Sequence, residues 1–191
     1  MPADPHDVLR SDPDLGPLVE AHGPLAVEPA DDLFERVVVS VVSQQVSTDA
    51  ATAIRERLFD AVTVTPAGVL AADPAVLREA GCSAAKARYL RNVARAFRGR
   101  GWDHAYFADL DDEIVVDELT AVTGVGTWTA KMFLVFCLGR EDVFPVEDLG
   151  IRRGMERVVD PDLDRDGMVA HAERWRPYRS YAARYLWRAV D

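Results

Sequence analysis

The chain has 191 residues, 49% of them hydrophobic, so it can bury a core and does not have the composition of a disordered segment. It opens with charges and prolines instead of a signal-peptide pattern, and its apolar runs at 37–42 and 132–138 are too short to span a membrane. We therefore expect a cytoplasmic protein with no membrane partner. Two cysteines without metal-ligand spacing and four scattered histidines argue against a disulfide scaffold, a zinc site or an iron–sulfur cluster.

The charge of the chain argues at first against a nucleic-acid partner. The formal net charge is −10, and Lys86 and Lys131 are the only lysines. DNA-binding proteins ordinarily carry a basic face, because neutralising phosphates dominates their affinity. An acidic, lysine-poor composition is also typical of a halophilic protein, since at about 1 M salt the Debye length falls to about 3 Å. Composition alone favours an ordinary acidic protein, so the motifs must decide the question.

Helical patterns follow one another along almost the whole chain, which predicts an all-α fold. The segment 31–46 places six apolar residues on one helical stripe: Leu33, Phe34, Val37, Val38, Val41 and Val42. Polar N-cap residues precede several of the expected helices: Ser47, Thr65, Asp73 and Ser83. The expected helices are 31–46, 48–62, two short ones from Pro66 and Pro74, 84–97, 112–122, 127–138, 149–158 and 167–190, with a break at Pro177.

The segment 119–130 carries the most chemical information. Gly124 and Gly126, spaced G-x-G between two amphipathic helices, predict a tight hairpin whose backbone can approach a ligand closely. Gly126 and Thr127 stand at the start of the second helix, where unpaired N–H groups and the helix dipole favour an anion such as a DNA phosphate. The same spacing also occurs where two helices merely turn and pack.

The context of this hairpin favours the DNA-binding interpretation. Residues 122–130 followed by 142–153 resemble the helix-hairpin-helix and invariant aspartate of the superfamily of DNA glycosylases named for these features. The segments 42–47, 77–90 and 175–182 are similar to the wedge, the additional small hairpin and the C-terminal segment of its 3-methyladenine glycosylase II branch. Thr123 departs from the pattern, because this position of the hairpin usually carries proline.

The resemblance implies that Asp148 is the catalytic carboxylate. Breaking an N-glycosidic bond builds positive charge on the sugar, and a fixed anion stabilises that charge. Capping the helix that begins at Leu149 is the purely structural alternative, and the two roles are compatible. Glu147 is the neighbouring candidate, but the family pattern selects Asp148.

The resemblance also implies the walls of a base pocket. Trp128 occupies the hairpin position where bifunctional relatives carry a lysine that attacks the sugar, so lyase activity is not expected. Its indole face, together with Met132 and Tyr178, would enclose the flipped base; core packing is the alternative for Trp128.

The remaining implied contacts concern DNA and a cation. Gln45 would fill the space left in the duplex by the flipped base, with Gln44 as the alternative, and Arg152 would contact a phosphate. In the family, main-chain carbonyls of the hairpin hold a monovalent cation. By position these carbonyls belong to Thr120, Val122 and Val125, so we expect a structural Na⁺ or K⁺ there and no required cofactor.

We therefore expect a monomeric, two-lobed helical protein: a central lobe at 34–142, with the helix-hairpin-helix at about 112–138, and a second lobe from 1–33 and 143–191, with the active site in the cleft. The expected function is that of a monofunctional DNA glycosylase which releases alkylated purines such as 3-methyladenine from double-stranded DNA during base excision repair. The alternatives are a glycosylase for deaminated or oxidised bases and a non-catalytic DNA-binding or damage-sensing module.

Overall fold

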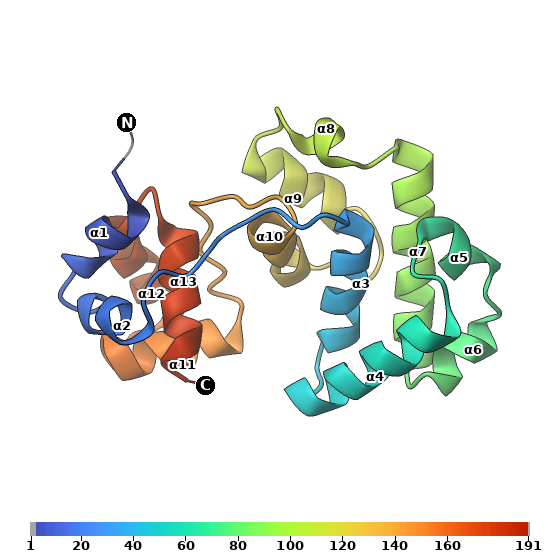
Figure 1. The fold of residues 1–191 in the computed structure, drawn as a ribbon, viewed down its shortest axis with the longest axis horizontal. Helices are drawn as coiled ribbons and strands as arrows, with labels where there is room; N and C mark the ends of the chain where they lie inside the picture. Colours follow the sequence, from blue (N-terminus) through green and yellow to red (C-terminus); the bar gives the residue numbers. More distant parts are fainter. Residues whose placement is uncertain (1–2, 191) are drawn as a thin grey trace. The chain divides into compact units, whose positions relative to one another are not determined.

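The computed structural model describes residues 3–190, and its regular elements are all helical (Figure 1). The chain folds into two compact units, one made of residues 30–138 and the other of residues 1–29 together with 139–191. Within residues 3–190, none of the helices is long and apolar enough to cross a membrane. The predicted all-α fold is confirmed.

The unit formed by residues 30–138 is built around α3 (Leu33–Ser43), α7 (Ala84–Arg100) and α10 (Thr127–Phe136). The other helices of this unit are α4 (Thr48–Ala61), α5 (Pro66–Ala71), α6 (Pro74–Glu79), α8 (His104–Phe107) and α9 (Asp112–Thr120). Helix α3 packs against α4, α7 and α10, while α5 and α6 pack on α7. All six apolar residues of the predicted stripe on α3 are buried, so this prediction is confirmed.

The predicted helix starts of this unit are confirmed by their side-chain caps. The Ser47 and Ser83 hydroxyls accept the N–H groups of Ala50 and Lys86, and Thr65 and Asp73 cap α5 and α6 in the same way. Helix α7 is three residues longer than predicted. It continues to Gly101, which ends it in the left-handed conformation at φ 66°, and two arginines in its last turn interact favourably with the helix dipole.

The other unit combines the two ends of the chain. It contains α1 (Pro5–Arg10), α2 (Gly16–His22), α11 (Leu149–Val158), α12 (Arg165–Ala172), the 3₁₀ turn η1 (Glu173–Trp175) and α13 (Arg179–Arg188). Helix α13 packs against α1, α2 and α11. The C-terminal helical segment is interrupted at Pro177, as predicted, and Trp175 lies in the core of the unit beside Phe144 and His171.

Both cysteines are buried in the unit formed by residues 30–138, and neither forms a disulfide. Cys137 is fully buried within an apolar environment, which raises the pKa of its thiol well above the usual range. It is therefore a small apolar core residue, as predicted. Within residues 3–190 no group of three or more His, Cys, Asp or Glu side chains could hold a metal ion.

Candidate functional site

The predicted hairpin is a tight turn between α9 and α10. The N–H of Val122 donates to the Leu119 carbonyl and the N–H of Val125 to the Val122 carbonyl, which closes the turn. Val122 and Val125 are buried and anchor the turn, whereas Gly126 and Thr127 are exposed at the start of α10. Exposed N–H groups at a helix start are suited to an anion.

Glycine occurs at the two hairpin positions for different structural reasons. Gly124 has φ 106°, a conformation that L side chains rarely adopt, and a Cβ atom there would overlap the ring of Tyr89 on α7. Gly126 has φ −97°, and a Cβ atom there would meet nothing within 4 Å. Packing therefore requires glycine at position 124, while at position 126 glycine leaves open space for a ligand beside the helix start.

The predicted wedge segment follows the end of α3, and the structure distinguishes its two glutamines. The Gln44 Nε2 group donates to the Gly124 carbonyl at 3.2 Å and to the Thr129 hydroxyl at 2.9 Å, so Gln44 ties the wedge to the hairpin. Gln45 is exposed and has φ 56°, the one positive φ among the described non-glycine residues. This conformation is costly for a residue with a side chain, and the wedge role of Gln45 stays a prediction.

Lys86 provides a second tie to the wedge. Its side chain is buried, and its Nζ donates to the Val42 carbonyl at 2.6 Å, in the last turn of α3. Burial lowers the pKa of the Lys86 ammonium. The positive charge at the C-terminal end of α3 also interacts favourably with the helix dipole.

Trp128 and Met132 lie one helical turn apart on α10. Met132 is buried, and Trp128 is half-buried. Their spacing puts them on the same side of α10, as the pocket prediction requires. They belong to the unit formed by residues 30–138, whereas Asp148 and Tyr178 belong to the other unit.

The loop that leads to Asp148 is held in place by α13. The buried Ser180 hydroxyl donates to the Arg140 carbonyl at 2.6 Å and accepts the Val143 N–H at 2.9 Å. The Arg179 guanidinium contacts both carboxylate oxygens of Asp142, at 2.7 and 3.2 Å. A fork-like arginine–carboxylate pair fixes geometry better than a single contact does, so the loop is a rigid support.

Asp148 begins α11 and is itself held by two donors. Its Oδ1 accepts the backbone N–H of Ile151 at 3.0 Å, which is the predicted N-cap hydrogen bond. The same oxygen accepts the indole N–H of Trp187 on α13 at 2.8 Å. The carboxylate is half-buried. Two donors from different helices orient the carboxylate.

The contact with Trp187 depends on two glycines of α11. A Cβ atom on Gly150 would lie 2.8 Å from the Trp187 ring and 3.0 Å from Asp148 Oδ1, and one on Gly154 would lie 2.6 Å from the Leu186 carbonyl. Glycine at both positions therefore lets α13 approach α11 closely. Gly150, Gly154 and Trp187 were not among the site residues predicted from the sequence. The i, i+4 glycine pair after Asp148 is a signal that could have predicted a close helix contact at α11, but it does not indicate Trp187.

Two other predicted site residues have contacts within their own unit. The Arg152 Nη1 group donates to the carbonyls of Val146 and Glu147, so it clamps the loop before Asp148. Tyr178 is buried, and its hydroxyl donates to the Ala3 carbonyl at 2.5 Å. The phosphate contact of Arg152 and the pocket role of Tyr178 stay predictions.

The structure is that of an all-α helix-hairpin-helix protein with an oriented aspartate at the start of a later helix. The model of the HhH-GPD superfamily base excision DNA repair protein family matches residues 38–178. The chain therefore belongs to the HhH-GPD superfamily.

Similar proteins place this chain in the 3-methyladenine glycosylase branch of the superfamily, as predicted from the sequence. DNA-3-methyladenine glycosylase 1 of Schizosaccharomyces pombe is 32% identical over 163 residues, which cover 81% of this chain and 71% of that protein. The structure of S. pombe Mag1 in complex with abasic DNA has a TM-score of 0.88 and 30% identity, and the match covers 97% and 96% of the two chains. A DNA-3-methyladenine glycosidase from Bacillus halodurans has a TM-score of 0.81 and 31% identity, with 98% and 89% covered.

Proposed function

We propose that this base excision repair enzyme, a DNA glycosylase for alkylated purines, uses Asp148 as its catalytic carboxylate. The observation that carries the proposal is the orientation of Asp148 Oδ1 by Ile151 and Trp187. A carboxylate that is held before the substrate binds needs no rearrangement to stabilise the positive charge that develops on the deoxyribose. The proposed substrate is double-stranded DNA with one damaged base, and a monomer is the proposed active form.

The reaction is a hydrolysis that requires no cofactor in this proposal. As the bond between C1′ and the base nitrogen breaks, its electrons leave with the base and the sugar acquires oxocarbenium character. The Asp148 carboxylate stabilises this cation and orients the water that adds to C1′. Trp128 stands at the hairpin position of the lyase lysine, so the enzyme is monofunctional and forms no Schiff base.

The selectivity for the damaged base is assigned to the residues of the proposed pocket. Alkylation at N3 or N7 makes a purine cationic and weakens its glycosidic bond, so such a base leaves without a strong general acid. An indole face attracts a cation, which gives Trp128 a larger role for a cationic base than for a neutral one. Met132 and Tyr178 are the other proposed pocket residues.

DNA binding is assigned to the hairpin and the wedge. Gly126 and Thr127 offer exposed backbone N–H groups to one phosphate, and Gln45 fills the stack where the base has left. Arg152 is kept as a proposed phosphate contact.

A monovalent cation is proposed to bind at the end of α9. Val122 and Val125 stand in the turn just after this helix, and Thr120 is its last residue. Main-chain carbonyl oxygens are suitable ligands for hard cations, and the C-terminal end of a helix dipole is negative. The carbonyls of Thr120, Val122 and Val125 would hold Na⁺ or K⁺, which would supply positive charge beside the phosphate of the hairpin.

The test is base release from duplexes that each carry one defined lesion, run at molar and at moderate salt. Release of 3-methyladenine and 7-methylguanine, faster than release of hypoxanthine or 8-oxoguanine, supports the proposal. Preferred release of the neutral lesions would assign the enzyme to deaminated or oxidised bases. Binding without release of any base would assign it to a damage-sensing module.

A further inference from the structure

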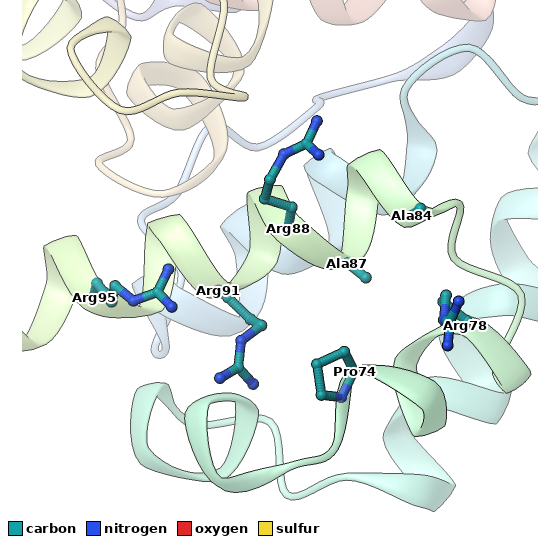
Figure 2. A pocket seen from close by; sticks show the side chains of 7 residues that line it. All are labelled: Pro74, Arg78, Ala84, Ala87, Arg88, Arg91 and Arg95. Carbon is teal, nitrogen blue, oxygen red and sulfur yellow. The ribbon is translucent and has the colours of Figure 1, made fainter.

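A groove lined by four arginines lies on the unit formed by residues 30–138, and none of its lining residues is assigned a role above. Figure 2 shows Arg88, Arg91 and Arg95 along α7, with Arg78 and Pro74 on α6. The groove has a volume of about 310 Å³. Arg78, Arg88 and Arg95 are exposed, and Arg91 is half-buried.

The spacing of these arginines follows one face of α7. Arg88, Arg91 and Arg95 are separated by three and four residues, so they form a continuous stripe along the helix. Like charges at this spacing repel and destabilise an isolated helix. Helix stability therefore does not explain the stripe.

The arginines of the groove are not neutralised by neighbouring carboxylates. Some arginines outside the groove pair with carboxylates, as Arg100 does with Glu118 and Arg179 with Asp142. Within residues 3–190, none of the four groove arginines has a carboxylate oxygen within 4 Å of its guanidinium. In a chain with 32 acidic and 22 basic residues, carboxylate partners are abundant. Four arginines that line one groove with no acidic residue among its lining form a concentrated positive charge, which favours an external anion.

Part of the groove is already ordered by hydrogen bonds. The Arg91 Nη1 group donates to the Ala72 carbonyl at 2.9 Å and to the Val69 carbonyl at 3.3 Å, which fixes this guanidinium at the end of α5. The Arg95 Nη1 group donates to the Asn92 side chain at 3.1 Å. A guanidinium has five donors, so both groups retain donors for an anion, and their planar geometry matches phosphate oxygens.

The same helix also supports the hairpin. Asn92 donates from Nδ2 to the Thr123 carbonyl at 3.0 Å, and Tyr89 packs against Gly124. Tyr89 and Asn92 follow Arg88 and Arg91 by one residue, so the hairpin and the arginine stripe occupy neighbouring faces of α7, about 100° apart around the helix. A polyanion that has a phosphate at the hairpin can continue toward the arginines.

We propose that this arginine groove is a second binding site for backbone phosphates of DNA, separate from the hairpin. The inference rests on the proposed DNA-binding function of the hairpin. The proximity of the hairpin favours DNA over an acidic protein segment as the occupant. The site positions the enzyme on DNA without reading bases and has no part in bond cleavage.

The test measures the salt dependence of binding to undamaged duplex DNA by the full chain. The variant is Arg88→Gln/Arg95→Gln, which leaves the hydrogen bonds of Arg91 intact. Each phosphate contact contributes about 0.9 to the magnitude of the slope of log K against log salt concentration. The slope of the variant should therefore be smaller in magnitude than that of the wild type by about 1.8. Between 50 and 200 mM salt, the wild type should then lose roughly tenfold more affinity than the variant.

Two controls separate a specific groove from general electrostatics. Arg157→Gln/Arg165→Gln removes two exposed arginines from the other unit and should leave the slope close to that of the wild type. Arg88→Lys/Arg95→Lys keeps the charges and should retain most of the slope. The melting temperature of each variant shows whether it folds.

The outcomes decide the proposal independently of catalysis, because the duplex carries no lesion. An unchanged slope in Arg88→Gln/Arg95→Gln, or an equal loss in the Arg157/Arg165 control, would overturn it. An unchanged duplex slope combined with binding of poly-glutamate that requires Arg88 and Arg95 would also overturn it, and would assign the groove to an acidic protein. Unchanged single-turnover base release by the groove variant at saturating DNA is the expected companion result.

Discussion

Replacing Trp187 with phenylalanine tests whether the orientation of Asp148 matters for catalysis. The change keeps an aromatic ring but removes the N–H that donates to Asp148 Oδ1 at 2.8 Å. A hydrogen bond to a charged group contributes about 1.5–3 kcal/mol, and each 1.36 kcal/mol changes a rate tenfold. The Ile151 N–H continues to hold the same oxygen, so part of this effect is retained. We therefore expect the single-turnover rate of base release to fall by roughly tenfold, with unchanged affinity for duplex DNA.

A double-mutant cycle distinguishes this positioning role from simple packing. In an Asp148→Asn background there is no carboxylate charge to orient, so Trp187→Phe should have little further effect on the rate. Trp175→Phe is the matched control: Trp175 is buried in the same unit, and among residues 3–190 its Nε1 has no hydrogen-bond partner. This control should lower the melting temperature with little effect on the rate. A wild-type rate in Trp187→Phe, or an equal rate loss in both backgrounds, would refute the reasoning.

The remaining predictions concern the hairpin and the pocket. Gly124→Ala should destabilise the fold by about 1–3 kcal/mol, because the left-handed φ and the Tyr89 ring both oppose a side chain. Gly126→Leu should keep the wild-type melting temperature but weaken binding to damaged and undamaged duplex alike. A loss of affinity confined to one lesion would indicate that position 126 lines the base pocket instead. Borohydride reduction during turnover should trap no protein–DNA adduct, and a stable adduct on electrophoresis would contradict hydrolysis without a Schiff base. Trp128→Ala should slow release of cationic purines more than release of hypoxanthine, whereas equal slowing would leave Trp128 as a packing residue.

Local patterns were sufficient to predict most of the fold. The apolar stripe of α3 and the N-caps at Ser47 and Ser83 depend only on residues that are close together in the sequence, and these predictions are confirmed. The short helices α1, α2 and α8 were not predicted, although Asp4 caps α1 and Asp103 caps α8. Helix α2 begins without a side-chain cap, so it depends on tertiary packing more than on its own sequence. The fully buried Leu9 and Leu15 show this packing at the N-terminal end.

The candidate site was harder to predict where it depends on distant residues. The sequence left Gln44 and Gln45 as alternatives for the wedge, because the hydrogen bond that anchors Gln44 reaches a residue 80 positions away. The contact between Trp187 and Asp148 spans 39 positions and exists only because α11 and α13 pack closely. By contrast, the N-cap role of Asp148 could be inferred locally, and it is confirmed.

The most direct test of the central claim is the single-turnover rate of 3-methyladenine release by Asp148→Asn. An asparagine Oδ1 can still accept the N–H groups of Ile151 and Trp187, and asparagine caps helices about as well as aspartate, so the fold should be preserved. Only the negative charge is lost. We predict a fall in rate of at least about 100-fold, with wild-type affinity for damaged duplex DNA and a wild-type melting temperature. A folded Asp148→Asn protein that releases the base at close to the wild-type rate would contradict the assignment of Asp148 as the catalytic carboxylate.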